Sequence, residues 1–182
     1  MARASASPPR PWADLAWPVL GTALTAGCFL LPPALVGARD YGDACTRDTA
    51  RLTLLLYAAA AALMLLLRPG EWPATAGRGR AARWLWTLGW AVYVVHVLTA
   101  FHFAHHWSHA RAVEHVRETS GWGEGVYVSY LFTLVWTLDV LWWWARPAAY
   151  AARPPWVGWA LHAFLAFVVF NGTVVFGSGV VR

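Results

Sequence analysis

The chain has 182 residues, of which 59% are hydrophobic and only 13% are charged. Soluble globular domains carry about 25% charged residues. Together with a mean hydropathy of +0.44, this composition excludes a large soluble core and indicates a membrane protein. All 14 basic residues are arginines scattered between apolar segments, which is typical of topology signals and offers no phosphate-binding face for nucleic acid.

The apolar segments predict an all-α fold, a polytopic transmembrane bundle of about five spans in one domain, 14–182. A Pro-, Ala- and Ser-rich lead, 1–13, is expected to be disordered. A cleaved signal peptide is the alternative for the first segment, but its apolar run continues past Cys28 to Val36, which favours a span. The expected spans are 15–36, 51–68, 84–105, 126–144 and 156–176.

The connections predict how the helices are arranged. Residues 37–50 are expected to form a loop. The third helix is expected to extend beyond the membrane to Glu118, because Ala110 to Glu118 contain neither Gly nor Pro, and to end before the Gly-rich segment 121–125. The side that holds the N-terminus has more arginines, which favours the inner (plasma) membrane with a cytoplasmic N-terminus and an external C-terminus.

The segment Phe101–His109 holds four of the seven histidines. On a helix, imidazoles three or four residues apart are neighbours, which is the spacing for two metal ligands from one helix. We therefore predict a divalent transition-metal site (Zn, Cu or Fe) at the outward end of the third helix. The alternatives are interfacial histidines that only solvate the helix end, and pH sensing. The candidate ligands are His102, His105, His106, His109, Glu114, His115 and Glu118, with Tyr127 and Tyr130 as hydrogen-bonding partners.

The run His102-Phe103-Ala104-His105-His106 resembles one histidine box of the membrane di-iron desaturases and hydroxylases. The resemblance covers five residues, and the further boxes that this family needs have no counterpart in the chain. No catalytic role is carried over from it.

Ionisable residues inside the expected spans form a second constellation. Asp139 and His162 lie at similar depth on consecutive spans, and a carboxylate in hydrocarbon needs a partner. We predict that their side chains meet, either to fix packing or for a proton or ion step. His96 lies near mid-bilayer, and its different depth argues against a haem held by His96 and His162.

The sequence leaves the function open between three hypotheses. The first is metal binding for transport, sensing or redox. The second is a structural or accessory subunit, as a homo-oligomer or within a larger membrane complex. The third and weaker one is a redox protein with haem or metal. Nucleophile and phosphate-loop motifs are absent, so an enzyme is not the expected class. The sequence does not decide whether Cys28 and Cys45 form a disulfide.

Overall fold

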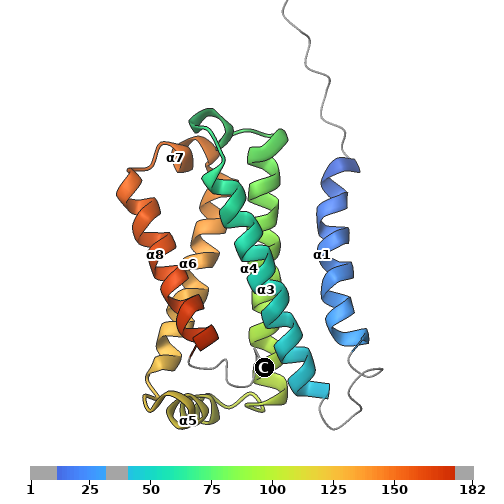
Figure 1. Cartoon of the computed structure of the whole chain (residues 1–182), viewed down its shortest axis with the longest axis vertical. Coiled ribbons are helices and arrows are strands. Elements are labelled where there is room, and N and C mark those ends of the chain that lie inside the picture. The colour runs from blue at the N-terminus through green and yellow to red at the C-terminus, as the bar shows by residue number, and fades with distance from the viewer. Residues whose placement is uncertain (1–11, 32–40, 175–182) are drawn as a thin grey trace, which may run out of the picture.

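The computed structural model describes residues 12–31 and 41–174, and helices are the only regular secondary structure in this part of the chain (Figure 1). Of the predicted N-terminal lead, only Trp12 and Ala13 are described, and they begin the first helix. The elements are α1 (Trp12–Leu30), α3 (Tyr41–Leu65), the 3₁₀ turn η1 (Pro69–Glu71), α4 (Gly77–Phe103), α5 (His109–Ser120), α6 (Gly125–Ala145), α7 (Pro147–Ala151) and α8 (Pro155–Val174).

Four of these helices, α3, α4, α6 and α8, are long and apolar enough to cross a membrane. By helix length and hydropathy the chain is therefore a multi-pass membrane protein. In α1 the apolar section runs from Leu15 to Leu30 and is shorter. The end of the predicted first span, 32–36, lies outside the described residues, as do 175 and 176 of the fifth.

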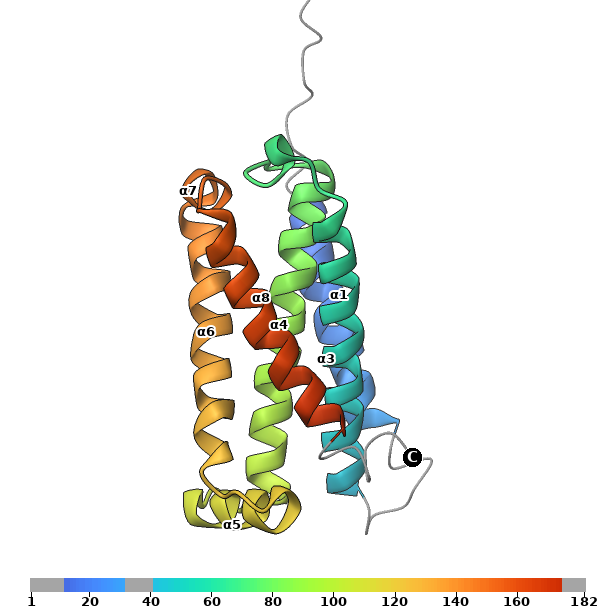
Figure 2. The ribbon, with the colours of Figure 1, turned by 60° about the vertical axis from the view of Figure 1, so that its left-hand side comes forward.

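The long helices alternate in direction, so the bundle has two distinct ends (Figures 1 and 2). One end is formed by η1, the start of α4 and α7, and is called the α7 end here. The opposite end is formed by the start of α3 and by α5, and is called the α5 end. Helix α8 runs obliquely to the other long helices (Figure 2).

Two helices begin earlier than the sequence predicts. The loop predicted over 37–50 is wrong for its described part, because α3 is already helical from Tyr41. Threonine hydroxyls in this stretch bond back to the carbonyls four residues earlier, as Thr49 does to Cys45 at 2.7 Å, so the polar side chains are satisfied within the helix. Helix α4 begins at Gly77. Two residues later, Gly79 packs so closely on the η1 turn that a Cβ there would collide with the Glu71 carbonyl.

The predicted outward extension of the third helix is wrong. Helix α4 ends at Phe103, and α5 is a separate helix that lies across the end of the bundle (Figure 2). The physical reason is a corner at His106 and Trp107, whose φ angles are 47° and 59°. Left-handed backbone cannot continue a right-handed helix. The side chain of Ser108 then accepts a hydrogen bond from the Arg111 amide and caps α5.

The core of the bundle is aromatic and lies towards the α7 end. Its largest fully buried side chains are Trp86, Trp136, Trp143 and Tyr150. Helix α8 contributes Leu165 to this core, while Trp159 on the same helix is 72% exposed. Most of α8 therefore faces the surroundings of the protein and not its interior.

Helix α1 packs against α4 at Gly21, where an added Cβ would overlap the Leu88 side chain. This close approach explains the small residue at that position. Both cysteines, Cys28 and Cys45, are free thiols.

Candidate functional site

The histidine segment is a corner between two helices and not a single stripe. His102 is on the last turn of α4, His105 and His106 lie in the corner, and His109 is the first residue of α5. The common helical face expected for these four imidazoles is therefore not formed. Composition gave no warning, because the corner contains neither Gly nor Pro.

Backbone hydrogen bonds hold this corner in place. The amide of His105 donates to the Ala100 carbonyl at 3.1 Å, that of Trp107 to Phe101 at 2.9 Å, and that of Ser108 to His105 at 2.9 Å. A left-handed conformation at a residue other than glycine carries strain of about 1–3 kcal/mol, and such strain concentrates at functional sites. Two adjacent strained residues therefore single out this corner within the described part of the chain.

The corner brings His105 against His115, which lies two turns into α5. Their ring centroids are 5.3 Å apart with an interplanar angle of 59°. Burial lowers the pKa of His105 below its ordinary value, and the imidazoles of His115 and His106 lower it further. A neutral His105 has a nitrogen lone pair available to a ligand.

The first two turns of α6 approach the same region through two tyrosines. Nδ1 of His109 lies 2.8 Å from the Tyr130 hydroxyl, within hydrogen-bonding distance. The His109 ring is also 5.8 Å from that of Tyr127. The two tyrosines therefore both contact His109. His109 and His105 thus have different partners, since His105 packs against His115.

The remaining members of the predicted ligand set are dispersed. His102 packs its ring against Phe103, and Glu114 forms an exposed 2.7 Å ion pair with Arg117. Glu118 is exposed on the last turns of α5. Within residues 12–31 and 41–174, no group of three or more His, Cys, Asp or Glu side chains is placed to share one metal ion. Among the predicted metal ligands in the described contacts, His105 and His115 are the pair whose rings touch.

Asp139 lies in the aromatic core, where it is only 2% exposed. Its Oδ2 accepts hydrogen bonds from the Trp86 indole at 2.8 Å and from the Tyr150 hydroxyl at 3.1 Å. Its Oδ1 has no hydrogen-bond partner among the described residues. The sequence indicates that this carboxyl needs partners. The partners are the indole of Trp86 and the phenol of Tyr150, whereas the sequence predicted the imidazole of His162.

His162, the predicted partner of Asp139, instead packs its ring edge-on against Trp86 with centroids 5.5 Å apart. Trp86 therefore contacts both predicted residues, and no hydrogen bond joins Asp139 to His162 in the described contacts. The sequence suggested the pair because Asp139 and His162 lie at a similar depth along their helices. Trp86 and Tyr150 also reach the level of Asp139, so depth alone does not identify the partner. The need to satisfy the buried Trp and Tyr donors is the signal that could have found them.

His96 is held by α3. Its Nδ1 lies 3.0 Å from the Thr46 carbonyl oxygen and 3.4 Å from the Thr49 hydroxyl. A carbonyl only accepts, so Nδ1 carries the proton at this contact. These bonds give His96 a role in joining α3 to α4.

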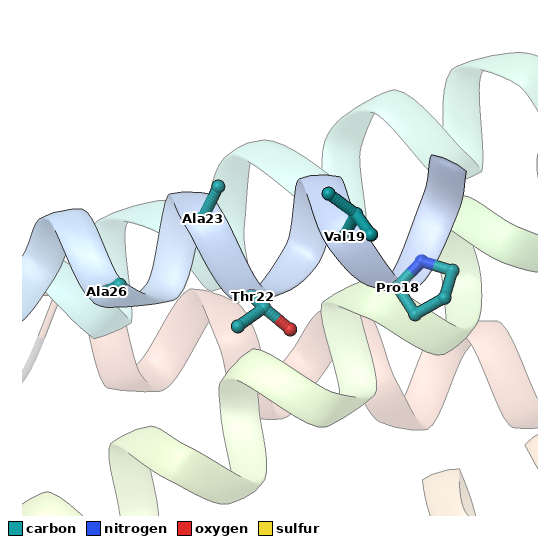
Figure 3. Close-up of a pocket in the computed structure, with 5 residues that line it drawn as sticks. All are labelled: Pro18, Val19, Thr22, Ala23 and Ala26. Atoms are coloured by element: carbon teal, nitrogen blue, oxygen red, sulfur yellow. The ribbon is translucent and has the colours of Figure 1, made fainter. Parts of the chain in front are cut away.

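An open hollow of about 430 Å³ lies along α1 (Figure 3). Its lining is almost entirely apolar and comes from this one helix, and none of the lining residues can be ionised. It is therefore a surface feature without the polar groups that fix a small ligand. The lining residues are Pro18, Val19, Thr22, Ala23 and Ala26.

No protein-family model, no curated protein and no solved structure matches this chain. The chemistry of its own side chains is therefore the guide to its function.

Proposed function

We propose that this multi-pass membrane protein binds a divalent transition metal at the corner between α4 and α5, with His105 and His115 as the protein ligands. The observation that carries the proposal is the contact between these two rings. It joins a residue of the corner to a residue of α5. Zinc, copper and iron all accept imidazole, and the present residues do not favour one of them.

The spacing of the two rings supports the proposal. Metal–nitrogen bonds of about 2.0–2.1 Å and a tetrahedral angle put the centres of two imidazoles about 5 Å apart. The observed separation is 5.3 Å. This separation is therefore compatible with two imidazoles on one ion, and it also falls within the range of about 4.5–7 Å of ordinary tilted aromatic contacts.

The surroundings support an open site. Two imidazoles leave at least two positions of a tetrahedral ion for water or another ligand, as in metal sites that exchange or activate what they bind. His106 adjoins His105, and its charge lowers the pKa of His105 further. His106 is exposed and next to His105 in the chain, which makes it a candidate for a third ligand.

Equilibrium dialysis of the full-length protein in detergent, with Zn²⁺ or Cu²⁺, tests the proposal. We expect one ion per chain, and we expect His105→Ala and His115→Ala each to abolish binding. His109→Ala is the matched control, because His109 is paired with Tyr130 and should leave binding unchanged. Undiminished binding in the His105→Ala/His115→Ala double variant would contradict the assignment.

A second candidate, an accessory subunit of a membrane complex, is favoured by α8. Four of its large aromatic residues are widely exposed, which suits contact with either lipid or a partner helix. A metal-free preparation that co-purifies with a partner at fixed stoichiometry would favour this role. The four residues are Trp156, Trp159, Phe167 and Phe170.

We infer a plasma-membrane location with the α7 end facing the cytoplasm, because arginines are more numerous at that end. The α5 end with the histidine corner then faces outward, and the N-terminus is cytoplasmic. In a variant whose free Cys28 and Cys45 are replaced by serine, labelling of single cysteines introduced at Gly70 and Glu118, on opposite ends, with a membrane-impermeant reagent tests this orientation. Labelling of position 70 in intact cells would reverse it.

A further inference from the structure

The α7 end of the bundle is strongly basic. Six arginines of the described residues lie there, against a single partly exposed acid, Glu71. The carboxylate of Glu71 is already engaged, because it accepts from the Arg68 amide at 2.7 Å and from the Arg78 guanidinium at 3.0 Å. Positive charge therefore remains after the internal pairing. The six are Arg68, Arg78, Arg80, Arg83, Arg146 and Arg153.

Two of these guanidinium groups are fixed on aromatic faces. Arg153 lies 3.7 Å from the Tyr150 ring centroid and 5.4 Å from that of Trp72. Arg83 lies 5.6 Å from the Trp143 ring centroid. The Trp143 and Tyr150 rings are themselves stacked, with centroids 4.8 Å apart. The aromatic cluster thus restrains two cations before any ligand arrives.

The hydrogen-bonding capacity of these groups is not used up. Arg83 is buried at 4% exposure, where its Nη2 donates to the Trp72 and Ala74 carbonyls at 3.3 Å and its Nε has no hydrogen-bond partner among the described residues. Arg146 is exposed, and neither it nor Arg153 forms an ion pair with a carboxylate in the described contacts, although Nη1 of Arg153 donates to the Tyr150 carbonyl at 3.1 Å. A guanidinium presents several donors in a fork that matches the oxygens of a phosphate.

We propose that the α7 end binds the phosphate headgroup of an anionic phospholipid, with Arg146 and Arg153 as its principal donors. A lipid is favoured over a free anion because the cluster lies at the end of membrane-spanning helices, where headgroups are at hand. Trp156, in the first turn of α8, is 70% exposed and offers an aromatic ring at the level where tryptophans meet the membrane interface.

The α5 end provides an internal contrast. There Arg51 pairs with Asp48 and Arg117 pairs with Glu114, each three residues away on the same helix. The charges at this end are thus largely compensated within the protein. Selectivity for an anionic headgroup is therefore expected at one end only, and it does not depend on the metal site at the other.

The experiment places the full-length protein in nanodiscs of phosphatidylcholine, with or without phosphatidylglycerol, and measures retained lipid by native mass spectrometry and Tm by thermal unfolding. We expect the wild type to retain phosphatidylglycerol and to have a higher Tm in nanodiscs that contain this lipid than in phosphatidylcholine alone. Arg146→Gln and Arg153→Gln should each weaken retention about fivefold, the value of one arginine near an anionic surface. Arg111→Gln, on exposed α5, is the matched control and should retain as much lipid as the wild type.

Equal retention in Arg146→Gln, Arg153→Gln and Arg111→Gln would overturn the proposal, as would equal retention of the two lipids by the wild type. Because Arg153 stacks on the core and its loss could disturb folding, the exposed Arg146 carries the decisive comparison. Inorganic phosphate added to phosphatidylcholine nanodiscs separates the sources. If it raises Tm as much as phosphatidylglycerol does, the site takes a free anion and the lipid assignment fails.

Discussion

The indole N–H of Trp86 donates a 2.8 Å hydrogen bond to Oδ2 of Asp139, joining α4 to α6 inside the aromatic core. The same oxygen accepts from the Tyr150 hydroxyl of α7 at 3.1 Å. One carboxyl group therefore connects three helices, and its loss should be felt by all of them.

Replacing Asp139 with alanine should destabilise the bundle, because it leaves the Trp86 and Tyr150 donors buried without an acceptor. Each such donor costs about 1–3 kcal/mol, so we expect the free energy of unfolding to fall by about 2–6 kcal/mol. Asp139→Asn keeps an oxygen acceptor and should lose less. Unfolding in a denaturing detergent measures the difference. Leu138→Ala, at a neighbouring exposed position, is the control, and a similar loss in both alanine variants would contradict the role of Asp139.

The two donors should be energetically coupled. Trp86→Phe and Tyr150→Phe each remove one hydrogen bond to Oδ2, which costs about 1 kcal/mol. Trp86→Phe loses more, because the smaller ring also leaves a cavity in the fully buried core. In the double variant Asp139 has neither donor, so the loss should exceed the sum of the single losses. A double-mutant cycle of unfolding free energies measures this coupling. Strict additivity would show that the two bonds act independently.

The corner at His106 should be stabilised by glycine. His106 has φ 47°, and a left-handed residue other than glycine costs about 1–2 kcal/mol, so His106→Gly should raise Tm. Ala104→Gly is the control, because Ala104 has an ordinary φ of −92° and glycine there should lower stability by about 0.4–1 kcal/mol through the greater freedom of the unfolded chain. Thermal unfolding compares the two. A lower Tm for His106→Gly would mean that its imidazole stabilises the corner by more than the strain it bears.

Acid should weaken the connection between α3 and α4 through Glu71. The Arg68 amide lowers the pKa of this carboxyl below its ordinary value of 4.5, and the Arg78 guanidinium lowers it further. The stability contributed by the carboxylate is present above pH 4.5 and is lost as the pH falls through the lower folded value. Tm measured across that range should fall less steeply for Glu71→Gln than for the wild type. Identical slopes would exclude the contribution.

His105 should also make stability depend on pH, in a higher range. Its folded pKa lies below the ordinary 6.5, so the unfolded chain takes up the proton first. Stability is therefore complete above pH 6.5 and declines as the pH falls from there through the folded pKa. His105→Gln should remove this part of the pH profile of Tm. His109→Gln, beside Tyr130, should leave it in place.

The sequence predicted the helical class and the bounds of α6 well, because composition and interfacial aromatic residues report on spans. It placed the start of α3 about ten residues late, since Asp43, Arg47 and Asp48 read as a polar loop although the intervening threonines are satisfied within the helix. Local polarity is ambiguous where side chains bond to their own helix.

For the histidine site, residue type was informative and geometry was not. The corner depends on left-handed backbone at His106 and Trp107, for which neither residue type is a signal. Asp139 illustrates the same limit. Its need for partners follows from burial of a carboxyl, but which donors reach it depends on how α4, α6 and α7 pack.

The strained corner at His106 and Trp107 has a consequence for any ion that bridges His105 and His115. The two rings meet only while the chain is folded back there, so metal affinity and the closed state of the corner are thermodynamically linked. A bound ion would favour the folded-back corner by the same factor in equilibrium constant by which the folded-back corner favours binding of the ion. Slower amide hydrogen exchange across 104–108 on loading would then be a measure of affinity in its own right.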